Sequence, residues 1–375
     1  MSAPAPDQSW KLTVSDRDND ELTVQLEQWL ATRVDADATP RVTGLVKPKG
    51  GGMSSATLLF DAEWSVGGES RGGRFVARLA PEADSFPLFE TYDLETQFAV
   101  MSGVADAIDA PLPGLHWLET DSAVLGSPFF VMGRVAGRVC EDNPPYVFTG
   151  WLFDATPEER AAITRHTVEV IAQVHAIDEP ARRFPMLAGD GSALRCHFQA
   201  QRDWYDWALA RDGFGIPVLE RAFDWLERNW PTESGTDVLT WGDARPGNIM
   251  FDGGDPTAVL DWEMAAIGPR ELDVAWPIFM HRFFQDMAVR FDQPGLPDFL
   301  RRSDVERLYT ERTGHAPQDM DWYLLYAALR HGIVMARIWR RMIHFGETTE
   351  PEDRDDFVMH RPLLEALLDG TYTWD

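Results

Sequence analysis

The chain has 375 residues, 44% of them hydrophobic, and its 61 acidic and 34 basic residues give a formal net charge of −27. This length suits two domains or one enzyme of two lobes. An acidic surface repels nucleic acid and anionic membranes and attracts cationic ligands, so we expect neither nucleic acid nor a membrane as partner. Acidity is also a common route to solubility, and it fixes no reaction.

No run in the sequence reaches the roughly 18 apolar residues of a membrane span. The N-terminus, MSAPAPDQSW, lacks the basic and apolar regions of a signal peptide. The two cysteines, Cys140 and Cys196, are too few for a disulfide framework and belong to no metal-ligand spacing. We therefore expect a cytoplasmic protein with free thiols.

The first 40 residues are a lead-in, with one helix predicted at 22–32. Its apolar face carries Leu22, Leu26, Trp29 and Leu30. From residue 41 to residue 133 the pattern is typical of a β-rich lobe with one helix at about 88–104. Four short apolar runs predict its strands, at residues 42–46, 56–60, 74–79 and 128–132.

Helical periodicity dominates residues 134–375, which we interpret as a second lobe. Thr156 and Glu159 predict a capping box around Pro157, a strong helix start. A hairpin is expected around residues 252–255. Further helices are predicted at residues 201–211, 217–229, 274–291, 303–313 and 321–345.

The segment Trp241-Gly242-Asp243-Ala244-Arg245-Pro246-Gly247-Asn248 places an aspartate and an asparagine five residues apart in a Gly/Pro loop. Asp261 follows inside an apolar run, where a carboxylate is costly unless it has a partner. Phosphoryl transfer uses such a set: one carboxylate accepts the proton of the attacking hydroxyl, and an amide oxygen and a second carboxylate hold Mg²⁺ on the phosphates. These residues predict Asp243 as the base and Asn248 and Asp261 as metal ligands.

These motifs resemble those of the aminoglycoside phosphotransferase and choline kinase families, H-G-D-x-x-x-x-N followed by I/L-D-W-E. Here they read W-G-D-A-R-P-G-N and L-D-W-E. Residues 268–276 are similar to the family's G-x-P-x-x-D-L-A segment, and residues 174–178 to its L-H-x-x-D segment. The wording G-D-x-R-x-G-N is most similar to the branch fused to some acyl-CoA dehydrogenases.

The resemblance covers roughly residues 40–345. It implies an α+β, protein-kinase-like fold of two lobes, a small β-rich N-terminal lobe that binds the nucleotide and a larger, mainly helical C-terminal lobe that holds the catalytic and acceptor-binding residues. It also implies ATP and Mg²⁺ as cofactors. The activity it implies is that of a small-molecule kinase with an alcohol group as acceptor.

A glycine-rich run at residues 50–55 stands where the family has its nucleotide loop. Glycines let backbone N–H groups approach phosphate, and serines add donors. The expected contacts are Gly51, Gly52, Ser54 and Ser55, although such a run also suits a flexible hairpin tip. Arg78 falls where the family places a phosphate-binding lysine, and it retains the positive charge.

The family orients that lysine with a helix glutamate in a pattern resembling Y-D-x-E-x-E. Here the pattern ends in Gln97, so either Gln97 or Glu95 partners Arg78. The two cannot both face it, because positions i and i+2 of a helix point about 200° apart. The adenine is expected at the lobe junction, against Phe130, Val131, Met132 and Arg134, although apolar residues there are also typical of plain core.

Trp241 replaces the family's usual histidine, which we expect to change support more than mechanism. Arg245 either neutralises the transferred phosphoryl group or forms a salt bridge to a carboxylate such as Glu263 or Asp261. Acidic residues of the helical lobe could line a pocket for a cationic acceptor, or could simply be solvated. These are Asp203, Asp206, Asp212, Glu263 and Glu271.

Three functions remain open. The first is an ATP-dependent O-phosphotransferase that moves the γ-phosphoryl group to a hydroxyl of a small, cationic molecule such as an aminoglycoside, with hydroxyacyl or sugar-alcohol acceptors as rivals. The second, motivated by Arg78, Gln97 and Trp241, is a nucleotide-binding pseudokinase. A protein kinase is disfavoured because H-R-D, D-F-G and A-P-E wording is missing. The sequence leaves open a monomer or a dimer.

Overall fold

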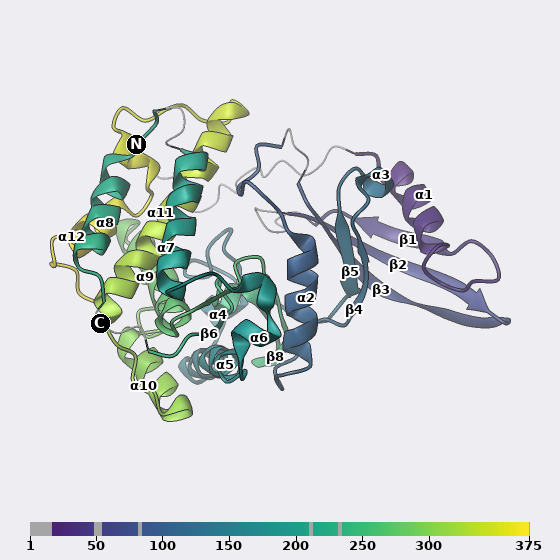
Figure 1. The fold of residues 1–375 in the computed structure, drawn as a ribbon, viewed down its shortest axis with the longest axis horizontal. Coiled ribbons are helices and arrows are strands. Elements are labelled where there is room, and N and C mark those ends of the chain that lie inside the picture. Colours follow the sequence, from purple (N-terminus) through teal and green to yellow (C-terminus); the bar gives the residue numbers. More distant parts are fainter. Residues whose placement is uncertain (1–16, 49–54, 82–84, 210–212, 232–234, 375) are drawn as a thin grey trace. The chain divides into compact units, whose positions relative to one another are not determined.

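The computed structural model describes residues 17–48, 55–81, 85–209, 213–231 and 235–374 (Figure 1). These residues form two compact units. The sheet unit holds residues 17–102 and 112–136, and the helical unit holds residues 103–111 and the described residues from 137 onward. In the part of the chain that is described, no helix is long and apolar enough to cross a membrane.

The sheet unit is built on five antiparallel strands in the order β1-β2-β3-β5-β4. They are β1 (Arg41–Val46), β2 (Ala56–Val66), β3 (Glu69–Leu79), β4 (Leu115–Glu119) and β5 (Phe129–Gly133). Strands β2 and β3 are longer than predicted because they continue into a two-residue turn, Gly67-Gly68. Both glycines have positive φ, 58° and 81°, as the tight hairpin turn requires.

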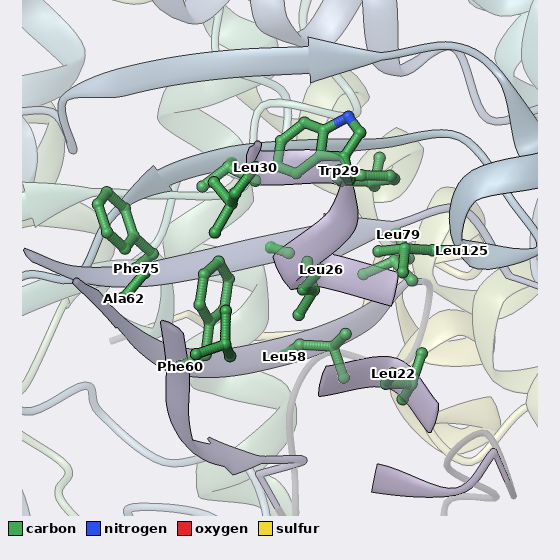
Figure 2. Packing of buried hydrophobic residues seen from close by; sticks show 14 residues of the cluster. Leu22, Leu26, Trp29, Leu30, Leu58, Phe60, Ala62, Phe75, Leu79 and Leu125 are labelled. Carbon is green, nitrogen blue, oxygen red and sulfur yellow. The ribbon is translucent and has the colours of Figure 1, made fainter. Parts of the chain in front are cut away.

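Helix α1 (Asn19–Leu30) packs its predicted apolar face against this sheet (Figure 2). Its N-cap is Asp18, whose carboxylate accepts the N–H groups of Asp20 and Glu21. The helix and sheet share one cluster of buried side chains. It includes Leu22, Leu26, Trp29, Leu30, Leu58, Phe60, Ala62, Phe75, Leu79 and Leu125. The predicted inward face of the first helix is therefore confirmed.

Helix α2 (Leu94–Ala105) begins six residues after its predicted start at Leu88. The Tyr92 hydroxyl accepts the N–H groups of Leu88 and Phe89, which holds this stretch in a turn. The Asp93 carboxylate then accepts the N–H of Thr96 and starts the helix. Local side-chain capping thus overrides the apolar periodicity. A short helix, α3 (Ser122–Leu125), precedes β5.

The helical unit contains nine α-helices among its described residues, and several match the prediction within a few residues. They are α4 (Trp151–Asp154), α5 (Pro157–His175), α6 (Pro180–Arg183), α7 (Ala193–Ala208), α8 (Pro217–Arg228), α9 (Glu271–Arg290), α10 (Arg302–Thr313), α11 (Met320–His344) and α12 (Arg361–Leu368). The capping box of α5 is confirmed: Thr156 and Glu159 exchange both bonds. Helix α7, predicted from Gln201, begins eight residues earlier, after the N-cap Ser192.

Two short antiparallel pairs carry the segments between α8 and α9. They are β6 (Val238–Thr240) with β9 (Ala266–Gly268), and β7 (Ile249–Asp252) with β8 (Asp255–Val259). The second pair is the predicted hairpin. Among the described residues the unit also has the 3-10 turns η1 (Pro185–Leu187), η3 (Pro246–Asn248) and η4 (Arg354–Phe357).

The interior of the helical unit contains many buried polar side chains. On α11, Arg330 is 1% exposed and His331 is also buried, so both side chains lie in the interior of the unit. Helix α11 packs against α9 and α8. The buried polar residues include His175, Glu271, Asp273, His281, Gln285, Arg330, His331 and His360.

Candidate active site

The loop of residues 241–248 leaves β6 and enters the β7–β8 hairpin through η3. The hairpin brings the chain back so that the Leu260 N–H donates to the Asn248 carbonyl at 2.8 Å. Asn248 and Asp261, thirteen residues apart, therefore become neighbours. Asp261 has a left-handed backbone, φ 62°, a conformation that aspartate tolerates better than most residues.

Three side chains donate hydrogen bonds to the Asp243 carboxylate. Its Oδ1 accepts Arg245 Nε at 2.9 Å and the indole N–H of Trp276, and its Oδ2 accepts Asn248 Nδ2 at 2.6 Å. The carboxylate is 16% exposed. Asp243, Arg245 and Asn248 are thus brought together as predicted, and the structure adds Trp276, which the sequence analysis did not assign to the site.

The amide of Asn248 is oriented by the same contacts. Its Nδ2 donates to both the carbonyl and the carboxylate of Asp243. The Oδ1 atom then points elsewhere, and none of the described residues donates to it. An amide oxygen and a carboxylate, as Asn248 and Asp261 carry, are the donor chemistry that Mg²⁺ prefers. Among the described residues no three His, Cys, Asp or Glu side chains are grouped to hold a metal ion alone, so Mg²⁺ would take further ligands from phosphate and water.

A buried aspartate fixes the start of the loop. Asp273, near the N-terminus of α9, accepts the backbone N–H groups of Trp241 at 2.6 Å and Gly242 at 2.8 Å. It also lies 3.1 Å from His175 Nε2. Asp273 and His175 lie within the motif segments at residues 268–276 and 174–178, but the sequence analysis assigned neither of them a role. The signal that could have identified Asp273 is a carboxylate inside the apolar run Leu272–Trp276.

Trp241 joins the loop to the segment that carries Asp261. Its buried indole N–H donates to the carbonyls of Leu260 at 2.9 Å and Asp261 at 3.1 Å. Gly242 next to it has φ 92°, and a Cβ there would lie 2.0 Å from the Met264 carbonyl oxygen. Only glycine fits that position. Both residues are structural supports of the loop.

Arg245 bridges two carboxylates. Besides Asp243, its Nη1 atom contacts Asp142 Oδ2 at 2.6 Å. Its ion pairs thus involve Asp142 and Asp243, where the sequence analysis had suggested Glu263 or Asp261. Burial lowers the pKa of Arg245, but the attraction of both carboxylates outweighs burial and raises the pKa above its ordinary value. The guanidinium therefore stays charged.

A second cation, Arg330, lies behind the loop. Its Nη2 donates to the Gly242 carbonyl at 3.0 Å, and its guanidinium stacks over the Trp276 ring at 4.4 Å. Burial lowers its pKa. Because Trp276 donates to Asp243, Arg330 supports Asp243 indirectly, through the Trp276 ring and through the loop backbone at Gly242.

In the sheet unit, β3 pairs Arg78 with Phe130 of β5 and with Thr57 of β2. Phe130, Val131 and Met132 are all buried. The N–H groups of Gly133 and Arg134 already donate to the carbonyls of Gly114 and Arg74, at 2.8 and 2.9 Å. A purine would therefore have to be read by other backbone groups of this segment.

Helix α2 turns Gln97 inward and leaves Glu95 exposed, which favours Gln97 as the partner of Arg78. Ser55 is buried, and its hydroxyl has no partner within the described part of the chain, so it is a candidate phosphate donor. Gly51, Gly52 and Ser54 lie outside the described residues.

The carboxylates expected in an acceptor pocket have different surroundings. Asp203 and Asp206 are exposed on α7 and contact Gln199 and Arg202 of the same helix. Glu271 is buried and accepts from His315 Nε2 at 2.9 Å and from the Gln318 N–H at 3.1 Å, the pattern of a structural residue. Glu263 is partly buried in the segment that carries Asp261. Asp212 lies outside the described residues.

The sequence profile of the phosphotransferase enzyme family matches residues 59–305. The chain belongs to this family. Its fold is that of the kinase-like phosphotransferases: a provisionally assigned aminoglycoside phosphotransferase from Ralstonia eutropha superposes with a TM-score of 0.63 at 23% identity, covering 93% of this chain and 98% of that one. Aminoglycoside phosphotransferase APH(4)-Ia, crystallised as a thermostable mutant with ADP and hygromycin B, gives a TM-score of 0.55 at 18% identity, covering 93% and 100%.

Among curated proteins, this phosphotransferase family member is 26% identical to the probable acyl-CoA dehydrogenase IBR3 of Arabidopsis thaliana over 337 residues. The match covers 85% of this chain but only 39% of IBR3. The chain thus spans about two fifths of that relative.

Proposed function

We propose that the chain is an ATP- and Mg²⁺-dependent O-phosphotransferase that transfers the γ-phosphoryl group to a hydroxyl of a small molecule. The observation that carries this proposal is the fixed Asp243 carboxylate. Two donors hold its Oδ1 and one holds its Oδ2, with Asn248 and Asp261 adjacent.

Asp243 would orient the acceptor hydroxyl and take its proton through Oδ2, the oxygen that carries only one donor. Asn248 Oδ1 and the Asp261 carboxylate would hold Mg²⁺, which offsets the negative charge of the nucleotide phosphates. Arg245 lies close enough to Asp243 to share in that neutralisation.

The sheet unit would supply the nucleotide contacts. Arg78 and Ser55 suit phosphate oxygens, with Gln97 orienting Arg78, and the predicted glycine contacts precede Ser55 in sequence. Phe130 to Arg134 would pack against the adenine of the nucleotide. The ADP in the APH(4)-Ia structure supports a nucleotide for this fold.

For the acceptor, the net charge of −27 and the hygromycin B bound by APH(4)-Ia favour a cationic, hydroxylated molecule such as an aminoglycoside. Asp203, Asp206 and Glu263 are the exposed or partly buried carboxylates that could receive it. A hydroxyacyl acceptor is the second candidate, because the curated relatives are named as acyl-CoA dehydrogenases. An aminoglycoside acceptor would make the chain an antibiotic-resistance protein.

An acceptor screen tests the proposal. Purified protein with ATP and Mg²⁺ is offered aminoglycosides, sugar alcohols, choline-like alcohols and hydroxyacyl-CoA species, and acceptor-dependent ADP formation is measured. We expect turnover with one class, lost on chelating Mg²⁺ and in Asp243→Asn. ATP binding with no turnover on any class would favour a pseudokinase instead.

A further inference from the structure

We infer that Asp142 is a positioning residue of this site, which acts on the base Asp243 through Arg245. The inference rests on the proposed function for its catalytic consequence. Asp142 lies in the helical unit, 103 residues before Arg245 in sequence. It belongs to none of the motifs that identify the family.

The contacts form a chain of three groups. Asp142 Oδ2 contacts Arg245 Nη1 at 2.6 Å, and Arg245 Nε donates to Asp243 Oδ1 at 2.9 Å. The other oxygen of Asp142, Oδ1, is shielded from solvent and has no partner among the described residues. The ion pair with Arg245 is therefore the contact that Asp142 makes here. Leaving the other carboxylate oxygen buried without a hydrogen bond costs free energy, so we infer that this ion pair is its function.

The backbone around Asp142 is attached to the hairpin that follows the loop. Arg138 and Phe251 exchange two backbone hydrogen bonds, at 2.9 and 2.8 Å, and so pin the segment to β7. The Tyr146 N–H donates to the Glu141 carbonyl at 2.8 Å and closes a turn around Asp142. Asp142 is thus fixed relative to β7, the strand that begins at Ile249, directly after Asn248.

Gly247 provides the space for this pair. A Cβ at Gly247 would lie 2.3 Å from Arg245 Nη1 and 3.3 Å from Asp142 Oδ1. The guanidinium therefore lies directly over the glycine backbone. This explains the spacing R-x-G in the loop: the arginine can reach back between two carboxylates only if the residue two positions later has no side chain.

The arrangement also divides the N–H donors of Arg245 between two carboxylates. With Asp142 present, the guanidinium offers Nη1 to one carboxylate and Nε to the other, so Asp243 receives a single bond from it. Without the Asp142 charge, the guanidinium is free to turn, and the geometry favours a forked contact in which Arg245 Nε and Nη2 both donate to Asp243. The base would then be held in the wrong orientation and its Oδ2 would be less available.

The test is a double-mutant cycle of Asp142→Asn and Arg245→Met, with Gly247→Ala as a second way to displace Arg245. We expect D142N to lower kcat about tenfold while the KM for ATP changes less than twofold, because the effect acts at the base and not on nucleotide binding. In the R245M background, D142N should have no further effect. G247A should reproduce R245M, since the added Cβ would lie 2.3 Å from Arg245 Nη1 and would displace the guanidinium.

The matched control is Glu220→Gln. Glu220 also contacts an arginine, Arg202 at 2.7 Å, and its side chain is 38% exposed against 36% for Asp142. E220Q should leave kcat unchanged. Additive effects of D142N and R245M, parental kcat in D142N, or an equal loss in E220Q would overturn the inference.

A crystal structure of D142N gives a readout that needs no turnover. We expect the single Nε–Oδ1 contact between Arg245 and Asp243 to be replaced by a forked one. An unchanged contact would overturn the inference, whether or not the parent protein is active. A parent without activity on every acceptor would instead count against the proposed function.

Discussion

The core of the sheet unit and the interior beneath residues 241–248 are built from different groups. In the sheet unit, α1 and the strands bury leucines, phenylalanines and a tryptophan against each other. Beneath the loop, Asp273, His175, Arg330 and Trp276 are buried and connected by directional contacts. One interior is apolar, and the other is a polar network.

Apolar burial stabilises a fold in proportion to area and without direction. A buried polar network contributes little net stability because its groups lose hydration, but it holds atoms in one arrangement. Stability and the geometry of the loop at residues 241–248 thus have separate sources in this chain. Single substitutions should therefore lower either turnover or the free energy of unfolding, but not both.

Asp243→Asn should give the largest effect. Removing the proposed base is expected to lower turnover about a thousandfold while ATP binding and the unfolding midpoint stay close to the parent values. Acceptor-dependent ADP formation and calorimetric ATP binding measure the two. Retention of more than a tenth of the activity would remove Asp243 from the role of base.

Leu26→Ala should act on stability alone. Leu26 is fully buried in the sheet-unit cluster, so its truncation is expected to cost about 3 kcal/mol of unfolding free energy. Val24 on the same helix is 50% exposed, and Val24→Ala should cost less than about 0.5 kcal/mol. Denaturant unfolding compares the pair. Equal costs would mean that α1 is not anchored through its predicted face.

Arg330→Met should lower turnover without lowering stability, the reverse of Leu26→Ala. Loss of the contacts to Gly242 and Trp276 is expected to lower turnover about tenfold, whereas replacing a buried cation by an apolar group should leave stability unchanged or higher. The control is Arg312→Met, a surface arginine on α10 paired with Glu169. A large loss of stability in R330M with normal turnover would contradict the division between the two interiors.

Lowering the pH should reduce the stability of the helical unit through its buried histidines. Burial lowers the pKa of His360 to about 4 and that of His281 to about 3, against about 6.5 in the unfolded chain. The unfolded state binds these protons first, so their stabilising contribution is complete above pH 6.5 and is lost as pH falls toward 4. We expect about 1 kcal/mol of lost stability per histidine by pH 5.5.

Thermal unfolding from pH 7 to 5 measures this loss, and His360→Gln should flatten the slope. In the sheet unit, partial desolvation lowers the pKa of His116 as well, but that residue is exposed. An unchanged slope in H360Q would place the acid sensitivity elsewhere.

The sequence predicted elements whose signals are local. The Thr156 capping box and the inward face of α1 follow from neighbouring residues, and both are confirmed. Strand β4 was missed because its five residues, LHWLE, are short and carry a histidine and a glutamate. The start of α2 was wrong because the Tyr92 side chain bonds to the backbone before it, which apolar periodicity does not register.

At the site, Asp243 and Asn248 are close in sequence, and their side chains contact each other in the structure. The other contacts to this loop come from far along the chain: Trp276 is 33 residues from Asp243, and Arg330 is 88 residues from Gly242. Trp276 and Arg330 lie in long, apolar helices, where a tryptophan or arginine has no distinguishing pattern. Only the packing of α9 against α11 brings them to the loop.

The β7–β8 hairpin determines how variable this site can be among relatives. The strand register and the Leu260–Asn248 backbone bond place Asp261 beside Asn248, so the number of residues between them is not itself a chemical requirement. A side chain added at Gly253 or Gly254 would meet no atom within 4 Å. A longer tip would therefore leave Asn248 and Asp261 in place. Family members with other spacings can keep these two residues adjacent, and the tip is a position where a reporter peptide could be inserted.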